Sequence, residues 1–140
     1  MAVFNKFNQF SKDLVDGKHQ FSAHTFKIML TNTAPVSTNQ VKADLTEIAA
    51  GFGYTAGGTA TTLSVNVAGG LTKVTGTDVV FTAAGGAIGP FRYAILYNDT
   101  QTSPADPLVG YWDYGAAITL ADTESLTVVF DASDGIIQVQ

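Results

Sequence analysis

The chain has 140 residues, a length typical of one domain and too short for two of ordinary size. Hydrophobic residues make up 46% of it, which is enough for a buried core and excludes a disordered chain. The absence of cysteine excludes a disulfide scaffold, a thiolate metal site and a cysteine nucleophile. Only 14% of the residues are charged and the net charge is −5, so nucleic acid is not an expected partner.

The charge is unevenly distributed along the chain. Up to Lys42, five lysines stand against two aspartates, a net charge of +3, whereas the remainder carries −8. Two interpretations remain open. The lysines belong either to a solvated helix face or to a basic, aromatic N-terminal arm that docks on an acidic partner surface.

The N-terminal segment has the spacing of an amphipathic helix. Val3, Phe7, Phe10 and Leu14 recur at steps of four, three and four, which places them on one helical stripe. Gly17 follows and can supply the left-handed residue that ends the helix. A helix this short is marginal in water, so it must dock on its own core or on a neighbouring subunit. Polar residues interrupt the apolar ones, which is unlike a signal peptide.

After this segment the hydrophobic period becomes that of β-strands. Alternating or β-branched runs bounded by turns predict eight strands, at 26–31, 62–67, 71–75, 79–82, 91–98, 108–114, 126–130 and 136–139. The sequence Asp44-Leu-Thr-Glu47 is close to a capping box and predicts a short helix over residues 44–50. Asp134-Gly135 is expected to form a hairpin turn before the last strand.

These elements predict a mainly β fold with two parts. Residues 1–17 form the N-terminal amphipathic helical arm, and residues 18–140 form a single domain of about eight strands. The short strands, threonine-rich outward positions and glycine-rich turns favour an antiparallel β-sandwich or jelly-roll-like architecture. No stretch is long and apolar enough to predict a membrane span.

Motifs for catalysis or ligand binding are scarce. His19 and His24 would not share a helix face and have no third ligand nearby in the sequence, so a zinc site is not expected. Residues 51–58 are glycine-rich but lack the ending of a phosphate loop, and residues 131–135 lack the acidic spacing of a calcium loop. We therefore predict no catalytic residue, no cofactor and no metal, and a protein that is not an enzyme.

Three aspartates leave open the alternative of an ion site. Asp99, Asp106 and Asp113 fall at steps of seven and could gather at one rim, where they would form an ion site. Loop and strand geometry do not make this spacing meaningful by itself, so the simpler interpretation is three separate surface residues.

The segment GYWDYG contains Tyr111, Trp112 and Tyr114. Alternation along a strand sends Tyr111 and Asp113 to one face and Trp112 and Tyr114 to the other. One face is then core, and the other is an aromatic surface or interface. The three aromatic residues are candidates for self-association, while a plain assignment to core and rim remains open.

Four stretches of the chain together resemble one known family. They are FNKFNQF followed by KDLVDGKHQF, HTFKIMLTNTAPVSTNQVKADLTEIAAGFGYTAGG, GPFRYAILYNDT, and DPLVGYWDYG followed by ITLADTESLTVVFDASDGIIQVQ. In order and over nearly the whole length, they are similar to small structural proteins of tailed bacteriophages that are encoded among head-morphogenesis genes. The pattern GPFRY-x-x-x-YND and the WDYG strand are the most specific pieces.

This resemblance implies a non-enzymatic virion component. It points to a capsid decoration (cement) protein, made in the host cytoplasm and bound as a trimer to the outside of the phage head, with the major capsid protein as partner. Candidates for capsid contact are the apolar residues of the N-terminal segment: Val3, Phe4, Phe7, Phe10 and Leu14. Deleting residues 1–16 is then expected to leave a folded β domain that no longer binds capsids.

Two alternative functions remain to be considered. The first is a phage tail or head-fibre component that binds a host surface glycan or receptor through aromatic side chains such as Tyr54, Trp112 or Tyr114. The second, and weaker, is an enzyme such as a wall hydrolase. Neither nucleic acid nor a membrane is an expected partner.

Overall fold

A computed structural model describes residues 2–140. Over this range it has ten strands, the α-helix α1 (Asn8–Val15) and the 3-10 helix η1 (Lys42–Asp44). The strands are β1 (Phe4–Lys6), β2 (Phe26–Thr31), β3 (Thr59–Thr61), β4 (Leu63–Ala68), β5 (Leu71–Gly76), β6 (Val79–Thr82), β7 (Ile88–Asn98), β8 (Leu108–Leu120), β9 (Ser125–Val128) and β10 (Ile137–Val139). The predicted mainly β fold is confirmed. None of the helices in residues 2–140 is long and apolar enough to cross a membrane.

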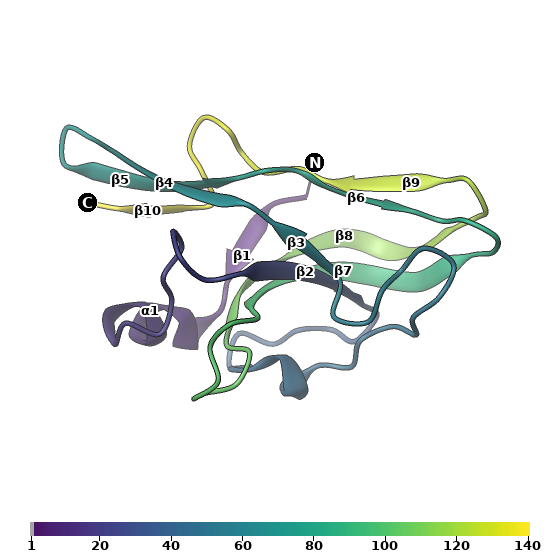
Figure 1. Cartoon of the computed structure of the whole chain (residues 1–140). Helices are drawn as coiled ribbons and strands as arrows, with labels where there is room; N and C mark the ends of the chain where they lie inside the picture. Colours follow the sequence, from purple (N-terminus) through teal and green to yellow (C-terminus); the bar gives the residue numbers. More distant parts are fainter. Residues whose placement is uncertain (1) are drawn as a thin grey trace.

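The strands form antiparallel sheets in two layers (Figure 1). One layer is a five-stranded sheet with the order β1-β8-β7-β2-β3. The other consists of two smaller sheets, β10-β5-β4 and β6-β9, which lie over one face of the large sheet. The chain passes between the layers where β3, paired with β2, is followed directly by β4, paired with β5.

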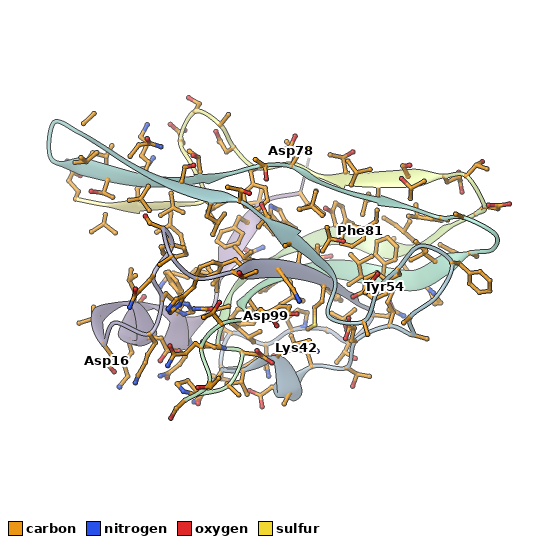
Figure 2. All side chains as sticks on the ribbon, in the orientation of Figure 1. Asp16, Lys42, Tyr54, Asp78, Phe81 and Asp99 are labelled. Atoms are coloured by element: carbon orange, nitrogen blue, oxygen red, sulfur yellow. The ribbon has the colours of Figure 1, made fainter. Side chains whose placement is uncertain are left out.

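The main hydrophobic core lies between the two layers. From the large sheet it receives Phe26, Ile28 and Leu30 of β2, Phe91, Ala94 and Leu96 of β7, and Val109 and Trp112 of β8. The smaller sheets contribute Val74 of β5, Phe81 of β6 and Val128 of β9. Figure 2 shows side chains from both layers filling this space, with Phe81 and Tyr54 labelled. Burying each large apolar side chain contributes about 1.5–3 kcal/mol.

A second, smaller cluster lies on the opposite face of the large sheet. Its buried members are Phe7, Met29, Leu45, Tyr93, Ile95, Tyr97 and Leu108. The segment between β2 and β3, which includes η1, passes beneath this face of the sheet (Figure 1). The central strands β2 and β7 are therefore buried on both faces, which explains their nearly continuous hydrophobic sequences.

The N-terminal segment differs from the predicted helical arm. Its first part is strand β1, which pairs with β8, and only Asn8–Val15 is helical. The helix ends as expected at Gly17, whose φ is +76°. The amides of Gly17 and Lys18 donate to the carbonyls of Leu14 and Asp13, the hydrogen-bond pattern of a Schellman motif.

The predicted helix over residues 44–50 is wrong. Helical structure there is limited to η1, which ends at Asp44, and Glu47 lies in a bridge with Thr31. The Asp44 carboxylate accepts hydrogen bonds from the amides of Gln40 and Val41, so it caps the preceding turn instead of a following helix.

The turn at Asp134-Gly135 does not join neighbouring strands. β9 pairs with β6, whereas β10 pairs with β5 in a different sheet. Gly135 has a φ of +74°, and the Val74 carbonyl lies where its side chain would be. A glycine is therefore required for the chain to enter β10 at this point.

Candidate functional site

Two sets of candidate residues from the sequence meet where β1 pairs with β8. Phe4 lies opposite Trp112 in the strand register, and the two ring centroids are 4.9 Å apart. A Cβ on Gly110 would overlap the Phe4 ring, so the glycine allows the ring to lie directly on β8. The Trp112 ring also packs edge-on against Phe130, with centroids 5.3 Å apart.

An apolar groove opens beside this cluster of aromatic rings. A cavity of about 520 Å³ is lined by Ala2, Trp112, Tyr114 and Val129, among others. A second cavity of about 410 Å³ shares Ala2, Trp112 and Val129 and extends to Val3. We call the two together the N-terminal groove; its complete lining is Ala2, Val3, Phe4, Trp112, Asp113, Tyr114, Gly115, Thr127, Val129, Asp131, Gly135 and Ile136.

Charged groups at the groove have partners within the chain. Arg92 donates two hydrogen bonds to the Asp113 carboxylate, at 2.8 and 3.1 Å, and lowers the pKa of that carboxyl group. Asp131 accepts hydrogen bonds from the amides of Ser133 and Asp134, which lower its pKa. Burial raises the pKa of Tyr114 to about 12, so its phenol stays protonated at neutral pH. The groove thus presents a mainly apolar surface, with one ion pair and one carboxylate bound by backbone amides at its border.

The candidate capsid-contact residues do not share one exposed surface. Val3 is 74% exposed, whereas Phe4 and Leu14 are half-buried. Phe7 and Phe10 are buried in their own chain. The expected helical stripe of Val3, Phe7, Phe10 and Leu14 is corrected, because the helix begins only at Asn8 and the residues before it form the extended strand β1 and its approach.

Phe7 and Phe10 attach the N-terminal segment to the domain. The Phe7 ring lies 5.2 Å from that of Tyr111 in the smaller cluster. Phe10 lies in the main core, with ring centroids 5.1 Å from His19 and 6.0 Å from Phe21. The N-terminal segment is therefore part of the fold and not a detached arm.

The candidate self-association residues follow the predicted alternation, but both faces of β8 are covered here. Tyr111 packs against the smaller cluster, and Trp112 is buried in the main core. Tyr114 is half-buried and lines the N-terminal groove. The expected division into one core face and one exposed aromatic face is corrected: only Tyr114 of the three has substantial access to the groove and no partner on β1.

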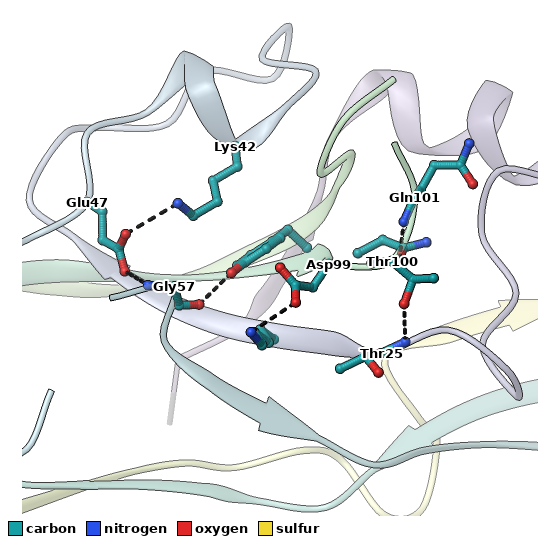
Figure 3. A network of polar contacts seen from close by, with 10 residues as sticks. Thr25, Lys42, Glu47, Gly57, Asp99, Thr100 and Gln101 are labelled. Atoms are coloured by element: carbon teal, nitrogen blue, oxygen red, sulfur yellow. Dashed lines mark hydrogen bonds and ion pairs between the residues drawn. The ribbon is translucent and has the colours of Figure 1, made fainter. Parts of the chain in front are cut away.

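Tyr54, a candidate for glycan stacking, is 3% exposed; its ring belongs to the main core and packs against Phe81, and its hydroxyl belongs to a polar network around Glu47. Its hydroxyl donates to Glu47 Oε1 at 2.6 Å and accepts a hydrogen bond from the Leu30 amide. Glu47 also accepts from the Gly57 amide and pairs with Lys42 at 3.3 Å (Figure 3). Burial and the Glu47 carboxylate raise the pKa of Tyr54. The network joins the loops between β2 and β3 to the sheet and leaves Tyr54 no free face.

The two histidines both lie beside the buried Asn98. Asn98 donates from Nδ2 to His24 Nδ1 at 2.8 Å and lies 3.3 Å from His19 Nδ1. His19 is buried next to Asp13, and burial lowers its pKa to about 4. In the part of the chain that the structure describes, no three histidine, aspartate or glutamate residues are grouped to hold a metal ion.

The three aspartates at steps of seven have different environments. Asp99 pairs with Lys27 at 2.9 Å, and Asp113 pairs with Arg92. Asp106 lies close enough to Asp99 for their charges to interact, and burial together with this charge raises its pKa. The structure therefore assigns Asp99 and Asp113 to separate ion pairs.

The sequence does not predict the groove, because its lining comes from the N-terminus, β8, β9 and the segment after β9. The network around Glu47 is not predicted either, because only folding brings Glu47, Tyr54 and Gly57 together. Comparisons with protein-family models, with curated proteins and with solved structures found no match for this chain.

Proposed function

We propose that the chain is a non-enzymatic virion structural protein: a capsid decoration (cement) protein that binds the outside of a tailed-phage head and stabilises contacts between major capsid protein subunits. The resemblance of its sequence to small phage structural proteins supports this function. The observation in the structure that carries it is the N-terminal groove, an apolar depression beside the exposed Val3. We further propose that the two layers form a jelly-roll-like β-sandwich.

The lining of the groove suits an apolar side chain or segment of a capsid subunit. Trp112 is buried and packs against both Phe4 and Phe130, so this wall of the groove is already ordered in the free protein. Burial of apolar surface contributes about 25 cal/mol per Å² before the costs of association are subtracted. A rigid wall reduces those costs because few side chains have to be ordered on binding.

The structure changes which residues we propose for contact with the capsid. Val3 and the groove replace the buried Phe7 and Phe10 as the surface offered to the shell. A single groove offers only a small contact area. We therefore propose that the chain forms a homo-oligomer, the trimer that the resemblance implies, which presents several grooves to the shell at once. Simultaneous binding at repeated sites on the shell adds avidity to modest single contacts.

Co-sedimentation of the purified protein with phage particles that lack it tests this proposal. Val3→Glu and Val129→Glu each place a charge in the groove and are expected to weaken particle binding at least tenfold. Val36→Glu is the matched control, because Val36 is 55% exposed and lies away from the groove lining. Equal binding by all three folded variants would contradict the role of the groove, and no binding by the wild-type protein would contradict the proposed function.

One observation favours the alternative, a tail or head-fibre component that binds a host glycan. Tyr114 lines a cavity of about 520 Å³, within the roughly 300–1,000 Å³ range of small-molecule sites. Tyr54 and Trp112 are both buried, so the stacking surface is reduced to Tyr114. A glycan array probed with wild-type protein and Tyr114→Ala separates the two functions: glycan binding that the variant loses supports the alternative.

A further inference from the structure

Strand β4 forms an open edge of the sheet β10-β5-β4. Its register with β5 is regular over all six residues, from Leu63 opposite Gly76 to Ala68 opposite Leu71. The amide of Thr77 donates to the carbonyl of Thr62, the position just before β4. The backbone groups of Thr62 therefore point toward β5. Because these groups alternate in direction along a strand, those of Ser64 and Asn66 also point toward β5, whereas the N–H and C=O groups of Val65 and Val67 point toward the open edge.

The same two valines present uncovered apolar side chains. Val65 lies opposite Val74, which is buried in the core, so both belong to the inward face of this layer. Nevertheless Val65 is 42% exposed and Val67 is 72% exposed. Figure 1 shows the reason: the β4–β5 hairpin projects past the end of β2, so the large sheet does not lie beneath its outer half.

The edge lacks the features that keep sheet edges apart. Edge strands of monomeric proteins are normally protected by lysine, proline, a bulge or very short length. Leu63–Ala68 contains no charged residue and no proline, and its pairing with β5 shows no register shift. An edge with free backbone groups and exposed valines is suited to accept another strand.

We propose that β4 pairs with β4 of a second copy of this chain, antiparallel across a two-fold axis at Asn66. In this register Val65 lies opposite Val67 of the partner subunit, and the two exchange both of their outward backbone hydrogen bonds. Asn66 lies opposite its own copy on the outer face. The two three-stranded sheets become one six-stranded sheet with a continuous apolar inner face.

A second copy fits this edge for two reasons. Since β4 carries no charge, an identical strand meets no electrostatic repulsion. A two-fold contact is self-complementary, so each exposed valine meets a valine, whereas a polar strand would leave these side chains unpaired. The contact is smaller than the roughly 800 Å² per partner of a standard interface, so it is weak in dilute solution and gains strength where other contacts hold copies together. The β4–β4 contact is compatible with a trimer that forms through another surface. In that case β4 of one trimer pairs with β4 of a second trimer.

Disulfide trapping tests the pairing directly, because the chain contains no cysteine of its own. In the proposed register, Asn66→Cys places two thiols at a non-hydrogen-bonded pair with Cα atoms about 4.5 Å apart, within the range of roughly 4.4–6.8 Å in which a disulfide forms. Under mild oxidation this variant is expected to become a covalent dimer.

Ser64→Cys is the matched control, because Ser64 is also exposed and on the same outer face of β4. In this register two copies of residue 64 are about 13 Å apart, four residue rises along the strand, which is too far for a disulfide. Mixing Ser64→Cys with Ala68→Cys instead brings the two thiols opposite each other and is expected to give a mixed dimer. Adding Val67→Lys to Asn66→Cys is expected to abolish cross-linking.

Equal cross-linking of Asn66→Cys and Ser64→Cys would show random collision and overturn the proposal, as would a monomeric Asn66→Cys with a circular-dichroism spectrum like that of the wild type. The experiment uses purified protein without particles. Its outcome is therefore independent of whether the chain decorates a phage head.

Discussion

Asn98 is a single side chain that connects three parts of the chain. It is fully buried, and its Oδ1 accepts hydrogen bonds from the amides of Thr100 and Gln101. Its Nδ2 donates to the carbonyl of Lys18 and to His24. The amide thereby joins the loop after β7 to the segment that follows α1.

Replacement of Asn98 by alanine is expected to lower the free energy of unfolding by about 2–4 kcal/mol, because several buried donors and acceptors lose their partner at once. Urea denaturation measures this change. Asn8→Ala is the control, since Asn8 is exposed and a surface substitution of this kind changes stability by about 0.5 kcal/mol or less. A loss in Asn98→Ala no larger than in the control would contradict the assigned role.

His19 makes the stability of the protein depend on pH. Burial lowers its folded-state pKa to about 4, against an ordinary value of 6.5, although the nearby Asp13 carboxylate partly opposes this change. Between pH 6.5 and 4 the unfolded chain therefore binds a proton that the folded chain does not, and stability falls as the pH falls. A difference of this size corresponds to about 3 kcal/mol, lost over that window and constant below it.

His19→Phe tests this dependence, because the ring lies among Phe10, Phe21 and Phe26 and a phenyl group fits the same apolar surroundings. Unfolding free energies at pH 7 and pH 4 are expected to differ less in this variant than in the wild type. An equal drop in both proteins would assign the pH dependence to other groups.

At the scale of elements, the N-terminal segment is necessary for the fold. It adds strand β1 to the large sheet and places Phe7 and Phe10 in two different clusters. Loss of a buried phenylalanine costs about 3–5 kcal/mol, and two such losses approach the roughly 5–15 kcal/mol that stabilises a typical domain.

Deletion of residues 1–16 is therefore expected to give a largely unfolded chain, and not the stable β domain that the sequence suggests. Deletion of residues 1–3 removes only the segment before β1 and is expected to preserve a cooperative thermal transition. Circular dichroism on heating distinguishes the two truncations. A cooperative transition near the wild-type temperature in the longer truncation would show that the segment is dispensable.

The strands that could be predicted from the sequence are those whose burial follows a simple pattern. The sequence predicts β6 with the bounds that the structure shows, because one face of this strand is buried and the other is exposed. β1 and β3 have only three residues each, and the sequences FNK and TAT are too short to show a pattern that could identify them. Their pairing depends on the neighbouring strands β8 and β2, which sequence reasoning does not bring together.

The helix predicted at residues 44–50 and the N-terminal groove show a second limit. Asp44 and Glu47 have the local spacing of a helix start, but their carboxylates bind the preceding turn and the distant Tyr54 instead. In the groove, Val129 and Ala2 are ordinary residues in the sequence and become significant only through their position beside Trp112. Local patterns identify elements, whereas sites built from several elements require the fold.

At the scale of the whole molecule, the low content of charged residues is consistent with the proposed function as a subunit of a larger assembly. Charged residues make up 14% of the chain, against about 25% in a typical soluble domain. Valines remain exposed at the N-terminus, on β4 and beside the groove. These surfaces are unfavourable in a free monomer and become favourable when copies of the chain and a shell cover them.

The most direct test of this account is an electron cryo-microscopy comparison of particles from wild-type phage and from phage that lack the gene. We expect additional density on the outside of the wild-type head, at repeated positions over joints between capsid subunits, that is absent from the deletion particles. Identical heads in the two reconstructions, or a difference confined to the tail, would contradict it.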